Sequence, residues 1–140
     1  MHRRDHTPDA EALFARFAKR HGLTYAVQTG APVEVMWLFP RQDGLNLPIT
    51  LGLQNGDELN FGVADFWSHI FPFGAVADDF ETLLDAWVTG DARIQVLGGR
   101  HRILQRRNGD RWETVYRANP PLLPLSQRVR EVIVNRGDGA

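Results

Sequence analysis

Four stretches in the first half of the chain alternate between apolar residues and others, which is the period of a β-strand. They read LTYAVQ (23–28), VEVMWLF (33–39), LPITLGL (47–53) and ELNFGV (58–63). Asn55-Gly56, between the last two, is a typical hairpin turn. Pro48 restricts the start of the third stretch to an edge or a bulge. The pattern predicts four consecutive strands in an antiparallel meander.

Two other stretches have the spacing of amphipathic helices. Residues 7–22 begin with a capping residue, Thr7, and Pro8, and they end at Gly22. Residues 77–90 begin with Asp78 as the predicted cap, and Gly90 ends the helix. Their predicted buried faces consist of Ala10, Leu13, Phe14, Phe17 and His21 in the first helix, and Phe80, Leu83, Leu84 and Trp87 in the second.

The last third of the chain returns to the period of strands. Residues 92–97 predict a strand, and residues 100–107 and 110–117 predict a hairpin around Asn108-Gly109. Residues 119–124, NPPLLP, form a proline-rich connector. Residues 126–137 predict a short helix capped by Ser126, with a strand or a frayed tail as alternatives.

The order α-ββββ-α-βββ-α favours an α+β fold over a doubly wound parallel sheet. We expect one strongly twisted, mainly antiparallel sheet of six or seven strands, with two or three helices on one face. Residues 1–6 are expected to be a flexible N-terminus and residues 7–118 a single domain. Residues 119–140 are expected to pack on that domain or to form a tail.

The composition excludes several kinds of chemistry. The 140 residues include no cysteine, which rules out disulfides, thiolate catalysis, iron–sulfur clusters and cysteine-bound zinc. The chain has no Walker loop, GxGxxG, HExxH or GxSxG motif, so we expect no cofactor. His2, Asp5 and His6 lie in the predicted flexible terminus, and no metal site is predicted there. No apolar run approaches the roughly 20 residues of a membrane span, and no secretory signal is evident, so a cytoplasmic location is expected.

The small net charge hides an asymmetry along the chain. Residues 1–90 hold 6 basic and 12 acidic residues, a net −6, whereas residues 91–140 hold 10 basic and 5 acidic residues, a net +5. The simplest interpretation is that opposite charges cover different faces of one fold. The alternative is a dipolar surface that docks an anion or an acidic partner, or pairs with a second copy.

The predicted hairpin separates its side chains onto two faces. Closing it on Asn108-Gly109 sets Arg106 opposite Arg111 on an arginine-rich side. An arginine-rich β face is a candidate contact for an anion or nucleic acid. Nucleic acid is not favoured, because no aromatic residue interleaves on that side and the chain is not basic overall. The arginine-rich side carries Arg100, Arg102, Leu104, Arg106, Arg111, Glu113, Val115 and Arg117, and the predicted core side carries His101, Ile103, Gln105, Trp112, Thr114 and Tyr116.

Residues 65–73, DFWSHIFPF, are the second candidate region. A short helical turn over residues 65–70 would place Asp65 and His69 on one face, so that the carboxylate orients the imidazole. This makes both residues weak catalytic candidates beside Ser68. The favoured alternative is a capping aspartate and a histidine that borders an apolar cluster. No regular element explains Trp67, which is therefore a candidate contact residue.

The leading hypothesis is a non-enzymatic protein-interaction module that forms a homodimer. Its basis is the absence of catalytic motifs together with apolar residues on both strand faces, because Met36 and Leu38 alternate with Val35 and Trp37. The order of elements is similar to that of small dimeric secretion chaperones, an analogy of architecture that implies a protein partner. A competing hypothesis is a small-ligand or enzyme-like pocket that uses His69 and Asp65. The candidate binding residues are Trp67, His69, His101, Arg102, Arg106 and Arg111.

Overall fold

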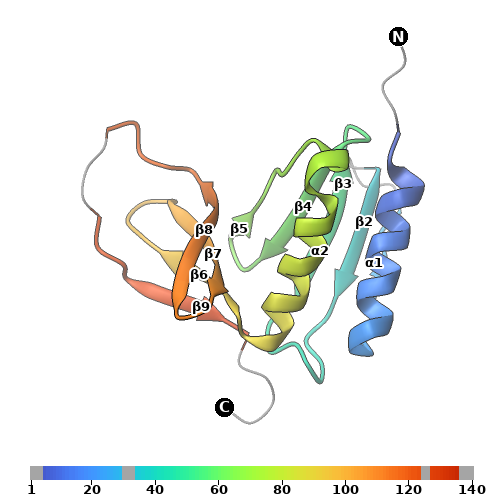
Figure 1. Cartoon of the computed structure of the whole chain (residues 1–140), viewed down its shortest axis with the longest axis horizontal. Helices are drawn as coiled ribbons and strands as arrows, with labels where there is room; N and C mark the ends of the chain where they lie inside the picture. Colours follow the sequence, from blue (N-terminus) through green and yellow to red (C-terminus); the bar gives the residue numbers. More distant parts are fainter. Residues whose placement is uncertain (1–4, 30–33, 124–126, 136–140) are drawn as a thin grey trace.

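The computed structural model describes residues 5–29, 34–123 and 127–135, and its strands form two antiparallel sheets (Figure 1). The first sheet has the order β1-β2-β3-β4-β5 and the second has the order β8-β7-β6-β9. The elements are α1 (Thr7–His21), β1 (Ala26–Val27), β2 (Val35–Phe39), β3 (Ile49–Gln54), β4 (Glu58–Val63), β5 (Phe66–Trp67), α2 (Phe73–Thr89), β6 (Ala92–Val96), β7 (Arg102–Asn108), β8 (Arg111–Ala118) and β9 (Glu131–Val134).

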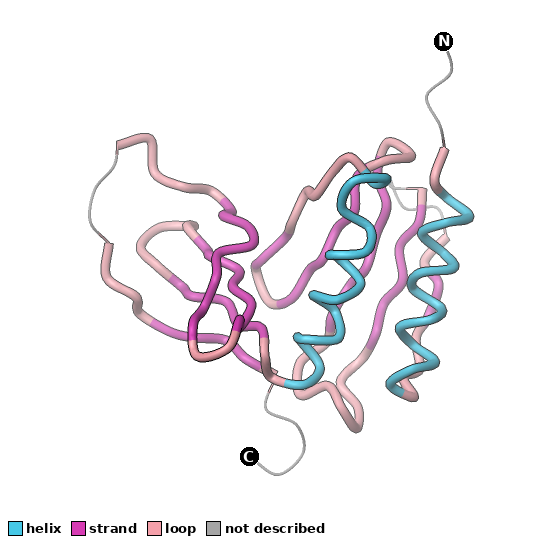
Figure 2. Tube along the Cα trace, in the orientation of Figure 1, coloured by secondary structure: helices cyan, strands magenta, loops and turns pink. Residues whose placement is uncertain are grey.

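The α+β class is confirmed, but the single sheet of six or seven strands is wrong. Figure 2 shows the strands in two separate groups. The two-residue strand β5 occupies the edge of the first sheet, and the chain then leaves that sheet through the 17 residues of α2. The later strands therefore begin away from the first meander and pair among themselves. Hydrophobic periodicity identifies strands, yet it does not say which strands share a sheet.

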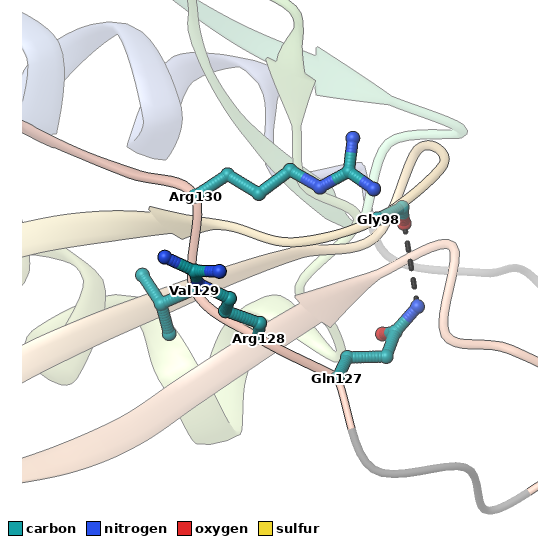
Figure 3. Close-up of a pocket in the computed structure, with 5 residues that line it drawn as sticks. All are labelled: Gly98, Gln127, Arg128, Val129 and Arg130. Atoms are coloured by element: carbon teal, nitrogen blue, oxygen red, sulfur yellow. Dashed lines mark hydrogen bonds between the residues drawn. The ribbon is translucent and has the colours of Figure 1, made fainter.

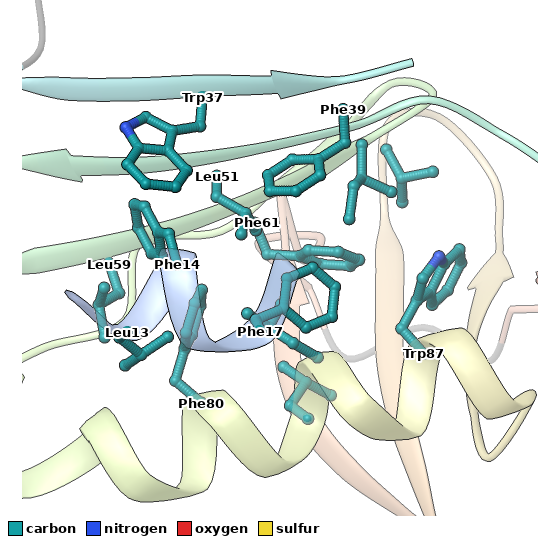
Figure 4. Close-up of a cluster of buried hydrophobic side chains, with 14 of the residues drawn as sticks. Leu13, Phe14, Phe17, Trp37, Phe39, Leu51, Leu59, Phe61, Phe80 and Trp87 are labelled. Atoms are coloured by element: carbon teal, nitrogen blue, oxygen red, sulfur yellow. The ribbon is translucent and has the colours of Figure 1, made fainter. Parts of the chain in front are cut away.

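The main core lies between the first sheet and the two helices (Figure 4). Phe14 of α1 packs edge-on against Trp37 of β2, at 5.7 Å between ring centroids. Trp87 of α2 makes the same kind of contact with Phe61 of β4, at 5.4 Å. Each large apolar side chain buried in this way contributes roughly 1.5–3 kcal/mol by its removal from water. The predicted helix faces and the odd-numbered side of β2 are confirmed as core, except for His21, which is half-buried and contacts Asp85 Oδ1 (2.7 Å).

Both helices begin earlier than predicted, and an aspartate accepts a hydrogen bond from the backbone N–H of the first residue of each. Asp5 Oδ1 accepts hydrogen bonds from the Thr7 backbone N–H (2.9 Å) and hydroxyl (2.6 Å), so Thr7 is the first helical residue and not the cap. The second helix begins at Phe73, whose N–H donates to Asp57 Oδ1 (3.0 Å), and Asp78 lies inside it. His6, which precedes α1, is buried and its ring stacks on that of Phe73.

The helical turn expected over residues 65–70 is wrong, because this segment is extended. Ala64 has a positive φ of 52°, which turns the chain back so that β5 pairs with β4. The Ser68 backbone N–H donates to Phe61 O (3.1 Å), and Ile70 bridges to Leu59. Side chains in this segment therefore alternate between the two faces of the first sheet.

The predicted register of the last hairpin is also wrong. The turn is Gly109-Asp110, so Arg106 pairs with Glu113 and not with Arg111. A bulge between Leu104 and Gln105 then sets Leu104 opposite Tyr116. Leu104 is fully buried in the core cluster, and its side of the hairpin, which was predicted to be the arginine face, is the one that packs inward.

The segment before residue 136 is a strand and not a helix. β9 pairs with β6, and Asn135 follows it with a side chain that is only 2% exposed. Asn135 Oδ1 accepts the Asn46 N–H (2.8 Å), while Nδ2 donates to Gly44 O (2.8 Å) and Val88 O (2.8 Å). The end of the second sheet is thereby tied to a loop of the first sheet and to α2. Ser126, the expected cap, lies outside the described residues.

Candidate functional site

A cleft separates α2 from the inner side of the β7–β8 hairpin. We call it the α2–hairpin cleft, and its volume is about 250 Å³. This is below the roughly 300–1,000 Å³ of typical small-molecule pockets, so it suits one or two side chains better than a cofactor. Its lining residues are Ile70, Val76, Asp79, Phe80, Leu83, Arg106, Glu113, Thr114 and Val115.

The floor of the cleft is apolar and its mouth is charged. Phe80 and Leu83 are 2% and 1% exposed, and they come from one face of α2 because they lie three residues apart. Val115, the residue at the hairpin bulge, keeps 38% of its surface exposed. Asp79 and Glu113 are exposed beside this apolar surface. The cleft therefore combines an apolar floor with polar groups at its rim.

Arg106 is the sequence-predicted binding residue that lines this cleft. Its side chain is half-buried, and among the described residues it makes no hydrogen bond or ion pair. Glu113, its cross-strand partner, accepts a hydrogen bond from Asn108 Nδ2 (2.6 Å). A half-buried guanidinium with unused donors is suited to the two-point binding of a carboxylate.

Arg102 and Asp65 are joined to each other. Arg102 Nε and Nη2 donate to the two carboxylate oxygens of Asp65, at 3.1 and 2.8 Å. This hydrogen-bonded contact lowers the pKa of the Asp65 carboxyl. Arg102 belongs to the second sheet and Asp65 to the β4–β5 turn, so the pair connects the two sheets. These two candidate residues therefore have a structural partner in each other.

His69 is separated from Asp65 and contacts a different carboxylate. His69 Nδ1 lies 3.1 Å from Glu58 Oε2, on a half-exposed side chain. Ser68 is fully buried, and its Oγ accepts the Phe61 N–H (2.9 Å). The structure thus does not bring Asp65, Ser68 and His69 into one arrangement. The extended backbone points Ser68 and His69 to opposite faces, and it separates Asp65 from His69 along the chain.

Trp67 lies against Gly62 on the side of the first sheet that faces away from the helices. A Cβ at Gly62 would be only 2.6 Å from Trp67 Cε3. The half-buried indole borders a hollow of about 370 Å³ whose lining is apolar except for one threonine. The hollow is lined by Leu47, Pro48, Thr50, Gly62, Val63, Ala64, Phe66 and Trp67.

His101 is buried near the β6–β7 connection. Its Nδ1 lies 2.6 Å from Gln127 Oε1, while Nε2 has no hydrogen-bond partner among the described residues. Gln127 also lines a hollow of about 600 Å³ with Gly98, Arg128, Val129 and Arg130 (Figure 3). Residues 127–130 and Gly98 are the lining of this hollow, so polar groups do not surround a ligand there from several sides.

The candidate binding residues are therefore dispersed. Trp67 and His69 lie on the first sheet, His101 and Arg102 make internal contacts, and Arg111 is exposed at the hairpin end. Three residues of the cleft are not predicted from the sequence, because they belong to no motif. They are Ile70, Val76 and Asp79. They become neighbours of the hairpin only because the later strands form a separate sheet that faces α2.

No group of three or more metal-ligating side chains occurs among the described residues. No helix within the described ranges is long and apolar enough to cross a membrane. Comparison with protein families, curated proteins and solved structures finds no match to this chain.

Proposed function

We propose that the protein is a non-enzymatic binding module that receives an apolar segment of a partner protein in the α2–hairpin cleft. The observation that carries this proposal is the combination of an apolar floor with the half-buried guanidinium of Arg106, which has no partner among the described residues. A partner with an aliphatic or aromatic side chain beside a carboxylate matches both features. The apolar side chain fills the floor, and the carboxylate pairs with Arg106.

The position of β8 supports an extended segment as the occupant. β8 is an edge strand that pairs with β7 on one side and with no described strand on the other. Thr114 and Val115 of this strand line the cleft opposite α2. A groove between an edge strand and a helix is one of the arrangements in which peptides bind by adding a strand. Main-chain hydrogen bonds then supply affinity, and the cleft supplies selectivity.

Selection of a random peptide display library on the immobilised protein tests this proposal. The selected peptides are expected to share an apolar residue near an aspartate or glutamate. Arg106→Gln and Val115→Lys should each weaken binding of a selected peptide by at least about tenfold, the size of one lost charged or apolar anchor. Val132→Lys is the matched control, since Val132 is similarly exposed (43%) but lies on the other side of the second sheet. Peptides that bind all three variants equally would exclude the cleft.

Self-association through the first sheet is a second proposal, favoured by the apolar hollow beside Trp67. Met36 and Leu38 are half-buried on the same side as this hollow, whereas the core residues of β2 face the helices. A second copy that covers this side would remove the apolar side chains of Met36, Leu38 and Trp67 from water. Light scattering at micromolar concentration should give a dimer for the wild type and a monomer for Leu38→Glu. Leu122→Glu, at a fully exposed leucine, is the control that should remain a dimer. A monomeric wild type would exclude this proposal.

A further inference from the structure

The side of the second sheet that faces away from the core gathers arginines around one tryptophan. We call it the outer face of the second sheet, and it is opposite the side that carries Ile94 and Leu104. The strand register sets its side chains in three rows. These rows are Arg107–Trp112, Val134–Arg93–Gln105–Thr114 and Val132–Gln95–Ile103–Arg117.

Two guanidinium groups lie over the ring of Trp112. The Cζ of Arg93 is 4.1 Å from the ring centroid, and the Cζ of Arg107 is 4.9 Å from it. Arg93 is further held by its Nε, which donates to Gln105 Oε1 (2.8 Å). Three planar groups that stack on bases in nucleic-acid complexes, one indole and two guanidiniums, are thus held in contact with one another.

The positive charge of this face is only weakly neutralised. Among the described residues of β6–β9, no acidic side chain belongs to the outer face. The nearest acid is Asp91, which precedes β6 and lies 3.7 Å from Arg107 with both side chains half-exposed. Arg117 is exposed, and among the described residues it has no ion-pair partner. Burial lowers the pKa of Arg93, because it disfavours the charged form. The nearby charge of Arg107 lowers it further, because the two cations repel each other. A bound anion would relieve that repulsion.

We propose that the outer face of the second sheet binds single-stranded nucleic acid. Exposed bases stack on Trp112 and on the guanidinium planes of Arg93 and Arg107, while Arg117 and Arg107 contact phosphates. A duplex is a poorer ligand, because its bases are paired within the stack and offer only phosphates to a flat sheet. A simple inorganic anion would bind the guanidinium groups alone and would not contact the indole of Trp112. Polar side chains in the same rows, Gln95 and Gln105, are positioned to contact base edges.

The register of the hairpin is what brings these groups together. The sequence pattern assigned Trp112 to a core side and the arginines to the opposite side, which argued against nucleic acid. With the observed register, Arg107 and Trp112 are cross-strand neighbours on one face. Arg111 lies on the opposite side of the same hairpin, where it pairs with Asn108.

Fluorescence anisotropy with labelled oligothymidylate in about 50 mM salt tests this proposal, since counterion release makes such contacts strongest at low salt. Trp112→Leu should weaken binding roughly 5- to 150-fold, the loss typical of one stacked base. The double variant R107Q/R117Q should reduce the slope of log affinity against log salt by about 1.4, or about 0.7 for each lost phosphate contact. Arg111→Gln, which removes one positive charge on the opposite side, is the control for a change of charge away from this face and should change affinity less than twofold.

Two other ligands separate nucleic-acid recognition from general attraction to polyanions. A duplex of the same length and heparin should both bind more weakly than the oligonucleotide and should be insensitive to Trp112→Leu.

Absence of oligonucleotide binding at low salt overturns the proposal. Equal losses in Arg111→Gln and R107Q/R117Q, or heparin binding that matches the oligonucleotide, also overturn it. Circular dichroism of each variant shows whether the sheet remains folded, and the exposed Arg117 provides a change that does not touch the core. Because the cleft lies on the other side of the sheet, these variants should leave the binding of selected peptides unchanged.

Discussion

Arg102 and Asp65 form a two-point pair that joins the second sheet to the β4–β5 turn of the first. The two ends of the pair differ in their surroundings. The arginine side chain is 11% exposed, whereas the aspartate is 65% exposed. Arg102 Nη1 also donates to the carbonyls of Leu97 (3.2 Å), Gly99 (3.2 Å) and His101 (2.9 Å). The arginine therefore organises the β6–β7 connection as well as the contact between sheets.

Substitutions at the two ends of this pair should have unequal effects. Asp65→Asn removes the charge of the exposed end of the pair and leaves the other hydrogen bonds of Arg102 in place, so it should lower the free energy of unfolding by at most about 1 kcal/mol. Arg102→Gln also leaves backbone carbonyls without their donor, so a loss of about 2–3 kcal/mol is expected. Urea denaturation of both variants and of the double variant measures these values. Equal losses at the two positions would contradict this description.

Ser68→Ala should destabilise the protein by about 1–3 kcal/mol, because it leaves the buried Phe61 N–H without its acceptor. The control is Thr82→Ala on the exposed face of α2, where the hydroxyl donates to Asp78 O (3.0 Å) within the helix. This change should alter stability by less than about 0.5 kcal/mol. Thermal unfolding followed by circular dichroism compares the two. If Ser68→Ala is as stable as Thr82→Ala, the hydrogen bond between the Phe61 N–H and Ser68 Oγ does not contribute measurably to stability.

Gly62 and Trp67 should be energetically coupled. Gly62→Ala places a methyl group 2.6–2.8 Å from the indole, so a loss of about 1–3 kcal/mol is expected in the wild type. In a Trp67→Ala background the same substitution should stabilise the strand by up to about 1 kcal/mol, because glycine is unfavourable within strands. A double-mutant cycle in guanidinium chloride measures the coupling. Additive effects would show that the indole does not rest on Gly62.

The ion pairs between α1 and α2 should make stability fall in acid. Hydrogen bonding to Arg16, supported by Arg20, lowers the pKa of the Glu81 carboxyl. A carboxyl with a lowered pKa in the folded state stabilises the protein above its unfolded pKa of about 4.3. That contribution is lost as the pH falls through the folded pKa. Glu81→Gln should therefore flatten the decline of stability below about pH 4 by up to roughly 1 kcal/mol, as measured by denaturation at several pH values. An unchanged pH profile would exclude a contribution from this pair.

The sequence predicted most elements and the antiparallel meander of the first sheet, but not the separate second sheet or the register of its hairpin. The helix of residues 7–22 and the strands around 35–39, 49–54 and 58–63 follow from local periodicity, which a single segment carries by itself. The register of the β7–β8 hairpin depends on one turn residue and one bulge, and a shift of one position exchanges the two faces. This is why Leu104 was assigned to the surface and Trp112 to the core.

The candidate site was less predictable than the fold. Of the residues selected from the sequence, Arg106 lines the α2–hairpin cleft. Arg102 and Asp65 form an ion pair with each other. Spacing along the chain suggested that Asp65 and His69 share a face, but that inference required a helical turn. The cleft joins residues of α2 to residues of the β7–β8 hairpin that are more than 20 positions away, and no pattern within one segment predicts such contacts.

The pairing of β9 with β6 also bears on the order in which the protein can fold during synthesis. The first sheet and both helices are complete once residue 89 has left the ribosome, so the main core can form early. The open edge of β6 then has to wait for residues 131–134, and the buried Asn135 can lock the two sheets together only after that. For this interval the nascent chain presents an unpaired strand edge, which is a hazard for association with other chains.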